Sequence, residues 1–251
     1  MIANELKRFF AALMFFTRIP CPSWANHSEA HIHHAGKYFP LVGLLIGATA
    51  SLVVLLTLRV YPQPVAVLLS MVATLLITGA IHEDGFADSC DGFGGGQTRE
   101  QIMRIMQDSR IGTFGTVGLI LLLALKFETL TLLAPGMLAI VLVAGHSTSR
   151  LIAISFLHTH LYVRPEGTGK SHAITQKMSI ADLALAGIFG LAPLALLPLR
   201  QALCALAVLL FVRFLIGCYM SRRLGGYTGD SLGAAQQVTE ILFYLTLLAM
   251  P

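Results

Sequence analysis

Residues 82–96, HEDGFADSCDGFGGG, contain three aspartates at a spacing that suits metal chemistry. Asp84, Asp88 and Asp91 stand at positions i, i+4 and i+7, which share one face of a helix. Like charges on one face repel each other unless a cation lies among them. Carboxylate oxygens suit Mg²⁺, which commonly bridges a few carboxylates and a substrate phosphate. The spacing therefore predicts a magnesium site with these three aspartates as ligands and Glu83 at its flank.

The glycines of the same stretch predict room for a large anion beside the metal. Gly92, Gly94 and Gly95 carry no side chain and would let the backbone approach such an anion closely. The alternative interpretation is a solvated acidic loop, because most charge runs are solvated. The helical spacing, the glycines and the preceding apolar run favour the metal–phosphate site. An EF-hand calcium loop does not fit, since its alternating ligand spacing is missing.

A second polar cluster, RIMQDSRIGTFG, spans residues 104–115. Arg104 and Arg110 could supply cations for phosphate oxygens, and Asp108 could orient one of the two arginines. The alternative is an interfacial helix whose long basic side chains reach out to water.

A third polar cluster, RRLGGYTGDSLGAAQQVTE, spans residues 222–240 and leads into the last apolar run. Arg222, Arg223 and Asp230 stand before this run, whereas Glu240 falls near its middle. A carboxylate at that depth is costly unless it faces a polar cavity or a partner. We therefore expect a functional role for Glu240, against the alternative of a turn followed by one tolerated glutamate.

Two further stretches carry ionisable or nucleophilic side chains within or beside apolar runs. In GHSTSR, His146 and Arg150 give an apolar run a polar face, which we expect to line the same cavity. A Ser–His nucleophile pair is a weaker alternative, as no elbow motif surrounds it. In HSEAHIHH, His27, His31 and His34 share a helical face and could bind a transition metal, but a solvated or interfacial cluster is the favoured interpretation.

A glycine-rich stretch, RPEGTGKSHAIT, spans residues 164–175 and resembles a phosphate-binding loop. It lacks the GxxxxGK[ST] spacing and follows no predicted strand, so nucleotide hydrolysis is a poor interpretation.

Composition indicates the elements that must position these groups. The 251 residues are 55% hydrophobic and only 12% charged, whereas about a quarter is usual for a soluble domain. Apolar runs long enough to cross a bilayer recur, so we predict one all-α domain over residues 1–251, a polytopic transmembrane helical bundle. Residues 1–20 predict an interfacial amphipathic helix rather than a signal peptide. The seven predicted spans are 38–60, 64–81, 113–133, 135–157, 180–198, 201–220 and 232–250.

The distribution of basic residues predicts the orientation. With the N-terminus inside, 12 of the 17 Lys and Arg fall in segments on its side. Only Arg59, Lys126 and Arg200 are assigned to the opposite side. This bias predicts that every motif-bearing loop is cytoplasmic. The basic balance then suits anionic lipids or an anionic substrate and requires no nucleic acid.

A Mg²⁺–carboxylate site beside arginines suits phosphoryl or nucleotidyl transfer, since metal and arginine neutralise charge that develops on a diphosphate. A carboxylate that is not bound to the metal could take the proton from an attacking hydroxyl. Rival interpretations are a transporter that uses Glu240, Asp230 and Arg150 as an ion path, and a non-catalytic membrane scaffold. The charges gather at one face and no two halves repeat, which argues against a transporter.

The three motifs HEDGFADSCDGFGGG, RIMQDSRIGTFG and GGYTGDSLGA, with TRIP and YFPLVG nearer the start, resemble those of the cobalamin (5′-phosphate) synthase family, the adenosylcobinamide-GDP ribazoletransferases. The resemblance implies a Mg²⁺-dependent transferase of the bacterial inner membrane, with its active site facing the cytoplasm. Such an enzyme joins adenosylcobinamide-GDP to α-ribazole, or to α-ribazole 5′-phosphate, and releases GMP. Its implied partners are these small molecules and membrane lipids, and a homodimer is left open.

The resemblance also implies roles for single residues. Asp84, Asp88 and Asp91 would hold Mg²⁺ on the diphosphate, and either Glu83 or Asp230 is the candidate base. The arginines expected to hold phosphate oxygens are Arg104, Arg110, Arg222 and Arg223. The stretch from Asp88 to Gly92 also resembles the start of the CDP-alcohol phosphotransferase signature. Its continuation is missing, so an enzyme of that kind remains an alternative.

Overall fold

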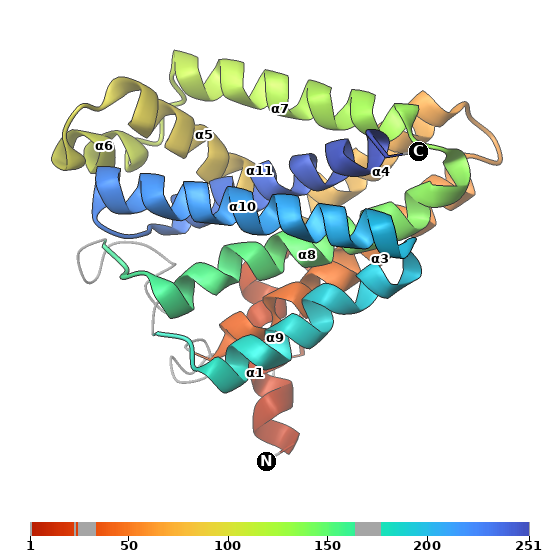
Figure 1. The fold of residues 1–251 in the computed structure, drawn as a ribbon, viewed down its shortest axis with the longest axis horizontal. Coiled ribbons are helices and arrows are strands. Elements are labelled where there is room, and N and C mark those ends of the chain that lie inside the picture. The colour runs from red at the N-terminus through yellow and green to blue at the C-terminus, as the bar shows by residue number, and fades with distance from the viewer. Residues whose placement is uncertain (1, 23, 25–33, 164–176, 251) are drawn as a thin grey trace.

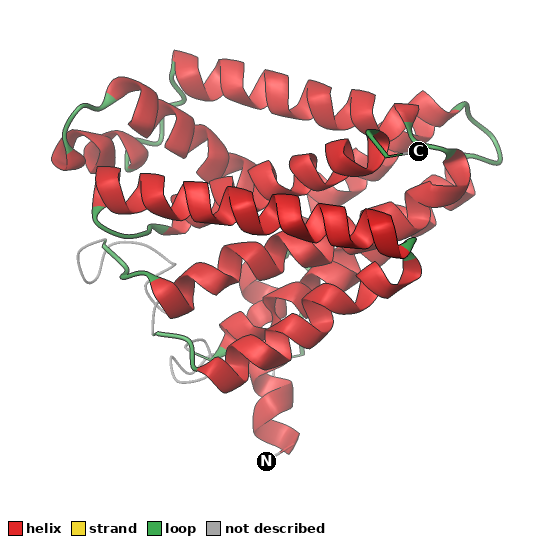
Figure 2. Ribbon diagram, viewed as in Figure 1, coloured by secondary structure: helices red, strands yellow, loops and turns green. Residues whose placement is uncertain are grey.

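The structure is a computed structural model that describes residues 2–22, 24, 34–163 and 177–250. In these ranges the regular structure consists of helices joined by loops, apart from an isolated bridge between Tyr162 and Tyr227, so the predicted all-α class is confirmed (Figures 1 and 2). The elements are α1 Ile2–Phe16, η1 Ala35–Tyr38, α3 Phe39–Thr57, α4 Gln63–Thr78, α5 Ile81–Gly95, α6 Arg99–Met106, α7 Thr113–Leu132, η2 Pro135–Met137, α8 Leu138–Thr159, α9 Ile180–Leu191, η4 Ala192–Leu196, α10 Leu199–Leu224 and α11 Gly229–Leu248.

The predicted number of seven spans is not confirmed. Four helical stretches of the described chain are long and apolar enough to cross a membrane, namely Ala35–Thr57, Thr113–Leu132, Pro135–Thr159 and Leu199–Leu224. The bent pair of α4 and α5 would make a fifth. The predicted span at 180–198 is a shorter apolar helix, Ile180–Leu196. The predicted span at 232–250 corresponds to α11. This helix is not apolar throughout, because it carries Gln236, Gln237 and Glu240, which are buried inside the protein.

The predicted span at 64–81 corresponds to α4, and a sharp bend at its end separates α4 from α5. The two helices meet at 88°. Gly79 and Ala80 both adopt positive φ values, of 66° and 58°, which end α4 after Thr78. Glycine adopts this conformation at little cost, whereas alanine does so only under local constraint. The chain after α1 braces the bend, because the Arg18 amide donates a hydrogen bond to the Ile77 carbonyl at 2.7 Å.

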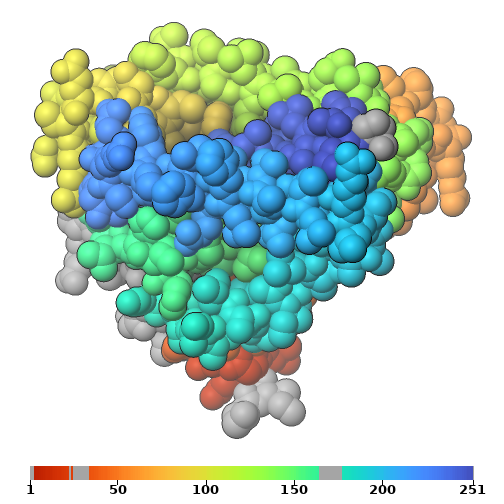
Figure 3. Space-filling view, in the orientation of Figure 1, coloured from red at the N-terminus to blue at the C-terminus, as the bar shows by residue number. Residues whose placement is uncertain are grey.

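The long helices run along the long axis of the molecule (Figure 1). The turn from α3 to α4 and the C-terminus lie at one end, and α5 and α6 lie at the other. The space-filling view shows a wedge that is broad across α7 and α10 and narrows toward α1 (Figure 3). Large apolar side chains such as Leu121, Phe211 and Phe214 are exposed on α7 and α10, which suits a lipid-facing surface.

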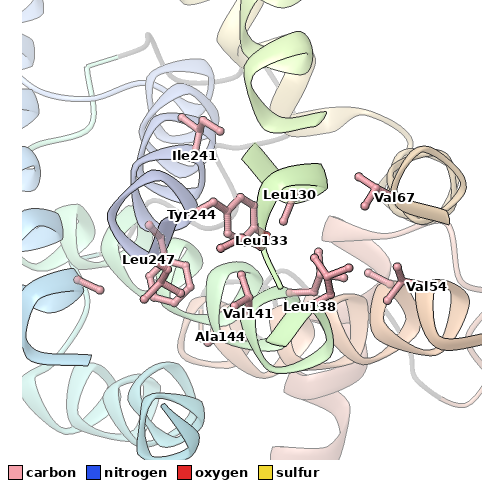
Figure 4. Packing of buried hydrophobic residues seen from close by; sticks show 14 of the residues in the cluster. Val54, Val67, Leu130, Leu133, Leu138, Val141, Ala144, Ile241, Tyr244 and Leu247 are labelled. Carbon is pink, nitrogen blue, oxygen red and sulfur yellow. The ribbon is translucent and has the colours of Figure 1, made fainter. Parts of the chain in front are cut away.

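The main core lies between α3, α4, α7, α8 and α11 (Figure 4). Val54, Val67, Leu130, Val141 and Tyr244 each come from a different one of these helices and are buried together. The helices α3 and α8 approach most closely at Gly43 and Gly47, where a Cβ on Gly47 would lie 2.7 Å from the Val143 Cα. Small residues four positions apart allow such close packing in a membrane, where dispersion contacts rather than water exclusion hold helices together.

The predicted N-terminal amphipathic helix is present as α1 and docks partly on the protein. Its buried face includes Leu13 and Phe16, and the Phe16 ring stacks on Phe39 with centroids 3.8 Å apart. Glu5 binds the Lys37 ammonium at 2.8 Å and the Tyr38 hydroxyl at 2.6 Å. These contacts orient the segment after α1, which forms part of the candidate site.

Candidate active site

A cavity of about 830 Å³ opens beside the bend between α4 and α5. We call it the acidic cavity, because among the described residues Glu83, Asp84 and Asp88 line it together with one basic residue, Arg18. The other walls come from the end of α1, the bend itself, and the segment before α7. Their lining residues are Met14, Phe15, Thr17, Thr78, Gly79, Ala80, Ile81, Ala87, Ser109, Ile111 and Leu119.

The first turns of α5 carry the three carboxylates of the cavity. Asp84 is exposed, whereas Glu83 and Asp88 are partly buried. The Glu83 Oε1 atom accepts a hydrogen bond from Gln237, while its Oε2 atom is buried and has no partner. The sequence spacing thus correctly predicted that Asp84 and Asp88 share a face beside Glu83.

Asp91 is turned away from the acidic cavity and caps the next helix. Its Oδ2 atom accepts the Gly112 amide at 2.7 Å, and its Oδ1 atom accepts the Gly115 amide at 2.8 Å. A carboxylate at a helix N-terminus satisfies free amides and complements the positive end of the helix dipole. Glycine is required beside it, since a Cβ on Gly112 would lie 2.5 Å from Oδ1. The structure therefore does not bring Asp91 together with Asp84 and Asp88.

The donor chemistry of the acidic cavity fits Mg²⁺ with two aspartates. Among the described residues, no group of three or more His, Cys, Asp or Glu side chains is arranged to hold a metal ion. Mg²⁺ usually takes one or two protein carboxylates and fills its other positions with water and substrate phosphate. Asp84 and Asp88 on one cavity wall, with the unpartnered Glu83 oxygen beside them, meet that need. The magnesium ion itself remains a prediction.

The glycines expected to approach an anion are in contact with neighbouring helices. A Cβ on Gly92 would lie 2.6 Å from the Met106 side chain, and one on Gly94 would lie 2.6 Å from the Phe114 ring. Gly95 is exposed. Close packing of α5 against α6 and α7 thus accounts for two of these glycines, and their role toward an anion stays a prediction.

Asp108 orients Arg110, as the sequence predicts. The Arg110 Nε and Nη2 atoms donate to the two Asp108 carboxylate oxygens at 3.0 and 2.7 Å. These hydrogen bonds from Arg110 lower the pKa of Asp108 to about 2, so the exposed pair stays charged. Ser109, between the two residues, lines the acidic cavity, which places the pair at its rim. Arg104 is exposed on α6 and is not part of the cavity lining.

The third motif lies beside α5 but outside the cavity lining. The Arg223 guanidinium donates to the Gly96 carbonyl at 2.7 Å and so ties the end of α10 to the end of α5. Arg222 is exposed. Asp230 lies in the first turn of α11, and its backbone packs so closely on α5 that a Cβ on Gly85 would lie 2.9 Å from its carbonyl oxygen. The predicted contacts of these residues with substrate remain predictions.

Glu240 is the centre of a buried polar network, which also contains Lys126, His146, Arg150, Gln236 and Gln237. Its carboxylate oxygens lie 2.9 Å from Lys126 Nζ and 3.1 Å from His146 Nδ1. Arg150 Nη1 is 3.8 Å from the carboxylate and donates to the His146 carbonyl at 2.9 Å. Neutralised in this way, a carboxylate can stay at the core of a bundle. The structure thus brings the predicted residues Glu240, His146 and Arg150 together, but in the packed core and not in the lining of the acidic cavity as expected. Their contact with substrate remains a prediction.

The placement of Lys126 corrects the sequence assignment to the opposite side of the membrane. Lys126 lies within α7 and is buried, because its ammonium is needed to compensate Glu240. It also donates to Gln237 Oε1 at 2.8 Å, and Gln237 Nε2 donates to Glu83 Oε1 at 2.8 Å. The buried polar network therefore reaches the wall of the acidic cavity.

Sequence reasoning missed two charged members of this region, Arg18 and Lys126. Both residues could have been noticed in the sequence, because Arg18 belongs to the TRIP stretch and Lys126 interrupts an apolar run. Two other predicted features, the pair His27 and His31 and the stretch 164–175, fall outside the described residues. His34 lies 3.8 Å from Asp182, away from the acidic cavity.

Apolar helices of spanning length, with a carboxylate-lined cavity and a compensated charge network among them, are compatible with a multi-pass membrane protein that carries an active site. The chain belongs to the cobalamin-5-phosphate synthase family, whose model matches residues 8–248. Relatives of this similarity are transferases, so the chain is an enzyme of that class.

Three curated relatives illustrate the family membership, and each carries the name adenosylcobinamide-GDP ribazoletransferase. The relative from Ralstonia pickettii (strain 12J) is 48% identical, over 98% of both chains. The one from Shewanella frigidimarina (strain NCIMB 400) is 45% identical, over 98% of this chain and 96% of the relative. The one from Ralstonia nicotianae is 47% identical, over 99% and 97%. No solved structure matches the chain.

Proposed function

We propose that this chain joins adenosylcobinamide-GDP to α-ribazole, or to α-ribazole 5′-phosphate, in a Mg²⁺-dependent reaction that releases GMP. The names of its relatives support the reaction. The observation that carries the assignment of the site is the acidic cavity, where three carboxylates and Arg18 share about 830 Å³. That volume is within the usual range of roughly 300–1,000 Å³ for ligand pockets.

Asp84 and Asp88 are the residues that would hold Mg²⁺, with Glu83 beside them. The ion would neutralise negative charge on the diphosphate that it shares with these carboxylates. This assignment keeps two of the three predicted ligands and leaves Asp91 as the cap of α7, because both Asp91 oxygens are occupied by amides.

The chain's own residues have separate tasks in the proposed reaction. Arg18, whose side chain packs against Gly79 at the bend, binds phosphate oxygens from the cavity lining, and Arg110 does so from the rim. Glu83 accepts the proton of the ribose hydroxyl through its unpartnered oxygen. The hydroxyl oxygen then forms a bond to the phosphorus nearer cobinamide, and the bond from that phosphorus to the GMP oxygen breaks. GMP leaves with the bonding electron pair as an additional negative charge.

The membrane placement is also part of the proposal. We infer that the protein lies in the bacterial inner membrane with the acidic cavity toward the cytoplasm. The distribution of Lys and Arg along the sequence supports this orientation. The exposed apolar side chains of α7 and α10 would then contact lipid.

The test uses the full-length protein, purified in detergent and supplied with both substrates and Mg²⁺, with GMP release as the readout. We expect turnover with Mg²⁺ and loss of turnover with a chelator. Asp84→Ala and Asp88→Ala should each lower kcat by at least about 100-fold, as expected when charge stabilisation of the transition state is lost. Wild-type protein that releases no GMP, or wild-type rates in both variants, would contradict the proposal.

A further inference from the structure

A chain of hydrogen bonds connects the buried charge of Glu240 with the wall of the acidic cavity. It runs from Glu240 through Lys126 and Gln237 to Glu83, with heavy-atom distances of 2.9, 2.8 and 2.8 Å. Its members come from α11, α7 and α5, so three helices meet in it. Fold stability alone does not require a polar chain that ends on a residue lining a cavity.

The chemistry of its two neighbours allows Gln237 one amide orientation. The Lys126 ammonium can only donate, so it must face the amide oxygen. On the other side, the Glu83 Oε1 atom accepts a hydrogen bond, so it faces the amide nitrogen. That nitrogen also donates to Gln236 Oε1 at 3.0 Å. A flipped amide would lose the bonds to both Lys126 and Glu83.

The Lys126 end of the chain is firmly anchored. Lys126 is 6% exposed and Glu240 is 1% exposed, so neither can exchange its partner for water without a rearrangement of the core. Gln236 donates to the second oxygen of Glu240 at 2.6 Å and to Ser149 at 3.0 Å. Gln237 is therefore held from the core side and donates one amide hydrogen bond to Glu83 on α5.

The Glu83 end has one oxygen held and the other without a partner. Gln237 fixes Oε1, whereas Oε2 is buried and unbonded in a residue that lines the acidic cavity. The charged groups around Glu83 come from several packed elements. They are Asp84 and Asp88 on α5 itself, Arg18 after α1, Lys126 on α7, Arg150 on α8, and Asp230 and Glu240 on α11.

We propose that Gln237, oriented by Lys126, is a positioning residue that fixes the Glu83 carboxylate at the wall of the acidic cavity for the transfer reaction. This inference rests on the proposed function, because it assigns Glu83 a part in that reaction. Gln237 acts through Glu83 and does not touch the reactants. Without its amide the Glu83 carboxylate would lose the hydrogen bond that fixes Oε1.

The test compares Gln237→Leu with Gln201→Leu as a matched control. Gln201 is also a buried glutamine, and its amide donates to the Met250 carbonyl at 2.7 Å, far from the cavity lining. In Gln237→Leu we expect kcat to fall ~10–100-fold, because small misplacements of a reacting group have effects of that size. The KM, and the Kd for adenosylcobinamide-GDP measured without the second substrate, should change less than about threefold, since a positioning residue acts on the reacting geometry and not on binding.

The background variant Glu83→Gln separates positioning from a structural role. If Gln237 acts only through Glu83, adding Gln237→Leu to Glu83→Gln should lower kcat by no more than about twofold further, because coupled residues are non-additive. Gln237→Asn keeps an amide but shortens the side chain, and it replaces Gln237→Leu in every comparison if the leucine variant does not fold.

Three outcomes would overturn the inference. The first is an unchanged kcat in the Gln237 variant. The second is a fall in kcat per folded molecule that is the same in Gln237→Leu and Gln201→Leu. The third is a fall in kcat of full size when Gln237→Leu is added to Glu83→Gln. Each of them requires an active wild-type enzyme, so failure of this inference is distinct from failure of the proposed function, in which the wild type itself releases no GMP.

Discussion

At the scale of single residues, the identity of a hydrogen-bond partner decides what a carboxylate does. Asp88 and Asp91 are three positions apart on one helix, yet Asp88 lines the acidic cavity and Asp91 caps α7. The spacing along α5 specifies the angle at which each side chain leaves the helix. It does not specify whether a cavity or the amides of another helix lie at that angle.

Asp91 and Asp84 should therefore respond differently to replacement by alanine. Asp91→Ala leaves the buried amides of Gly112 and Gly115 without acceptors, so we expect a loss of about 1–2 kcal/mol in the free energy of unfolding. Asp84→Ala removes an exposed side chain and should change that free energy by less than about 0.5 kcal/mol while it removes turnover. Unfolding in detergent, followed by circular dichroism, measures the first quantity, and GMP release measures the second. The reverse pattern would show that Asp91 is not mainly a cap.

The docking of α1 should depend on pH through Glu5. Burial raises the pKa of Glu5. Hydrogen bonds from Lys37 and Tyr38 and the charges of Lys37 and Arg8 outweigh that effect and lower the pKa to about 2. Because the folded pKa lies below the ordinary value of 4.5, the stabilisation is present above pH 4.5 and is lost as the pH falls toward 2.

Trp24, the single tryptophan, packs edge-on against Phe10 of α1 with centroids 5.1 Å apart, so its fluorescence can follow the docking of α1. We expect its emission to shift between pH 4.5 and 2 in the wild-type protein. Glu5→Gln removes the titrating carboxyl, so that variant should show no such shift. A shift of the same size in both proteins would exclude Glu5 as the cause.

At the scale of elements, the close approach of helices is what brings the polar groups together. The helices α3 and α8 meet at Gly43 and Gly47, and α5 meets α11 where Gly85 packs on Asp230. Larger residues at these positions would separate helices whose polar side chains must stay within hydrogen-bond distance. The bend at Gly79 and Ala80 has the same effect, because it turns α5 so that its carboxylates face the segment after α1.

Gly47→Ala should be destabilising, whereas Gly187→Ala should not. A Cβ on Gly47 would lie 2.7 Å from a backbone atom of α8, and a Cβ on Gly187 would meet nothing within 4 Å. We expect Gly47→Ala to lower the free energy of unfolding by about 1–3 kcal/mol, as overpacking does. Gly187→Ala should be neutral or stabilising by up to about 1 kcal/mol, because alanine favours helix. Equal unfolding midpoints for the two variants in detergent would contradict close packing of α3 on α8.

At the scale of the whole molecule, the protein combines an apolar outside with a compensated polar inside. Exposed apolar residues such as Phe211 and Phe214 surround a core in which Lys126 and Glu240 form an ion pair. Such a pair is tolerated when each charge has a partner and further hydrogen bonds. The acidic cavity lies at the edge of this core, at the bend between α4 and α5.

The proposed orientation predicts which loops a membrane-impermeant thiol reagent reaches. In a background with Cys21, Cys90, Cys204 and Cys218 replaced by serine, Arg59→Cys should react from outside intact cells and Arg222→Cys should not. Opening the cells should make Arg222→Cys reactive, because the positive-inside rule places that segment in the cytoplasm. Labelling of Arg222→Cys in intact cells would reverse the orientation.

The sequence by itself determined the all-helical class, most helix positions, the shared face of Asp84 and Asp88, and the family. Local periodicity, apolar length and motif spacing are properties of consecutive residues, so they can be read without coordinates. The pairing of Asp108 with Arg110 was readable for the same reason, as only two positions separate these residues.

Only the tertiary structure decided that Asp91 caps α7, that Lys126 is buried against Glu240, and that Gln237 connects both to Glu83. It also decided that α5 leaves the end of α4 at a sharp bend, and that α11 keeps a glutamate inside. These outcomes depend on partners more than 20 residues away along the chain. The physical reason is that a buried charge is stable only beside its counterpart, and the helices that supply the counterpart are brought there by packing.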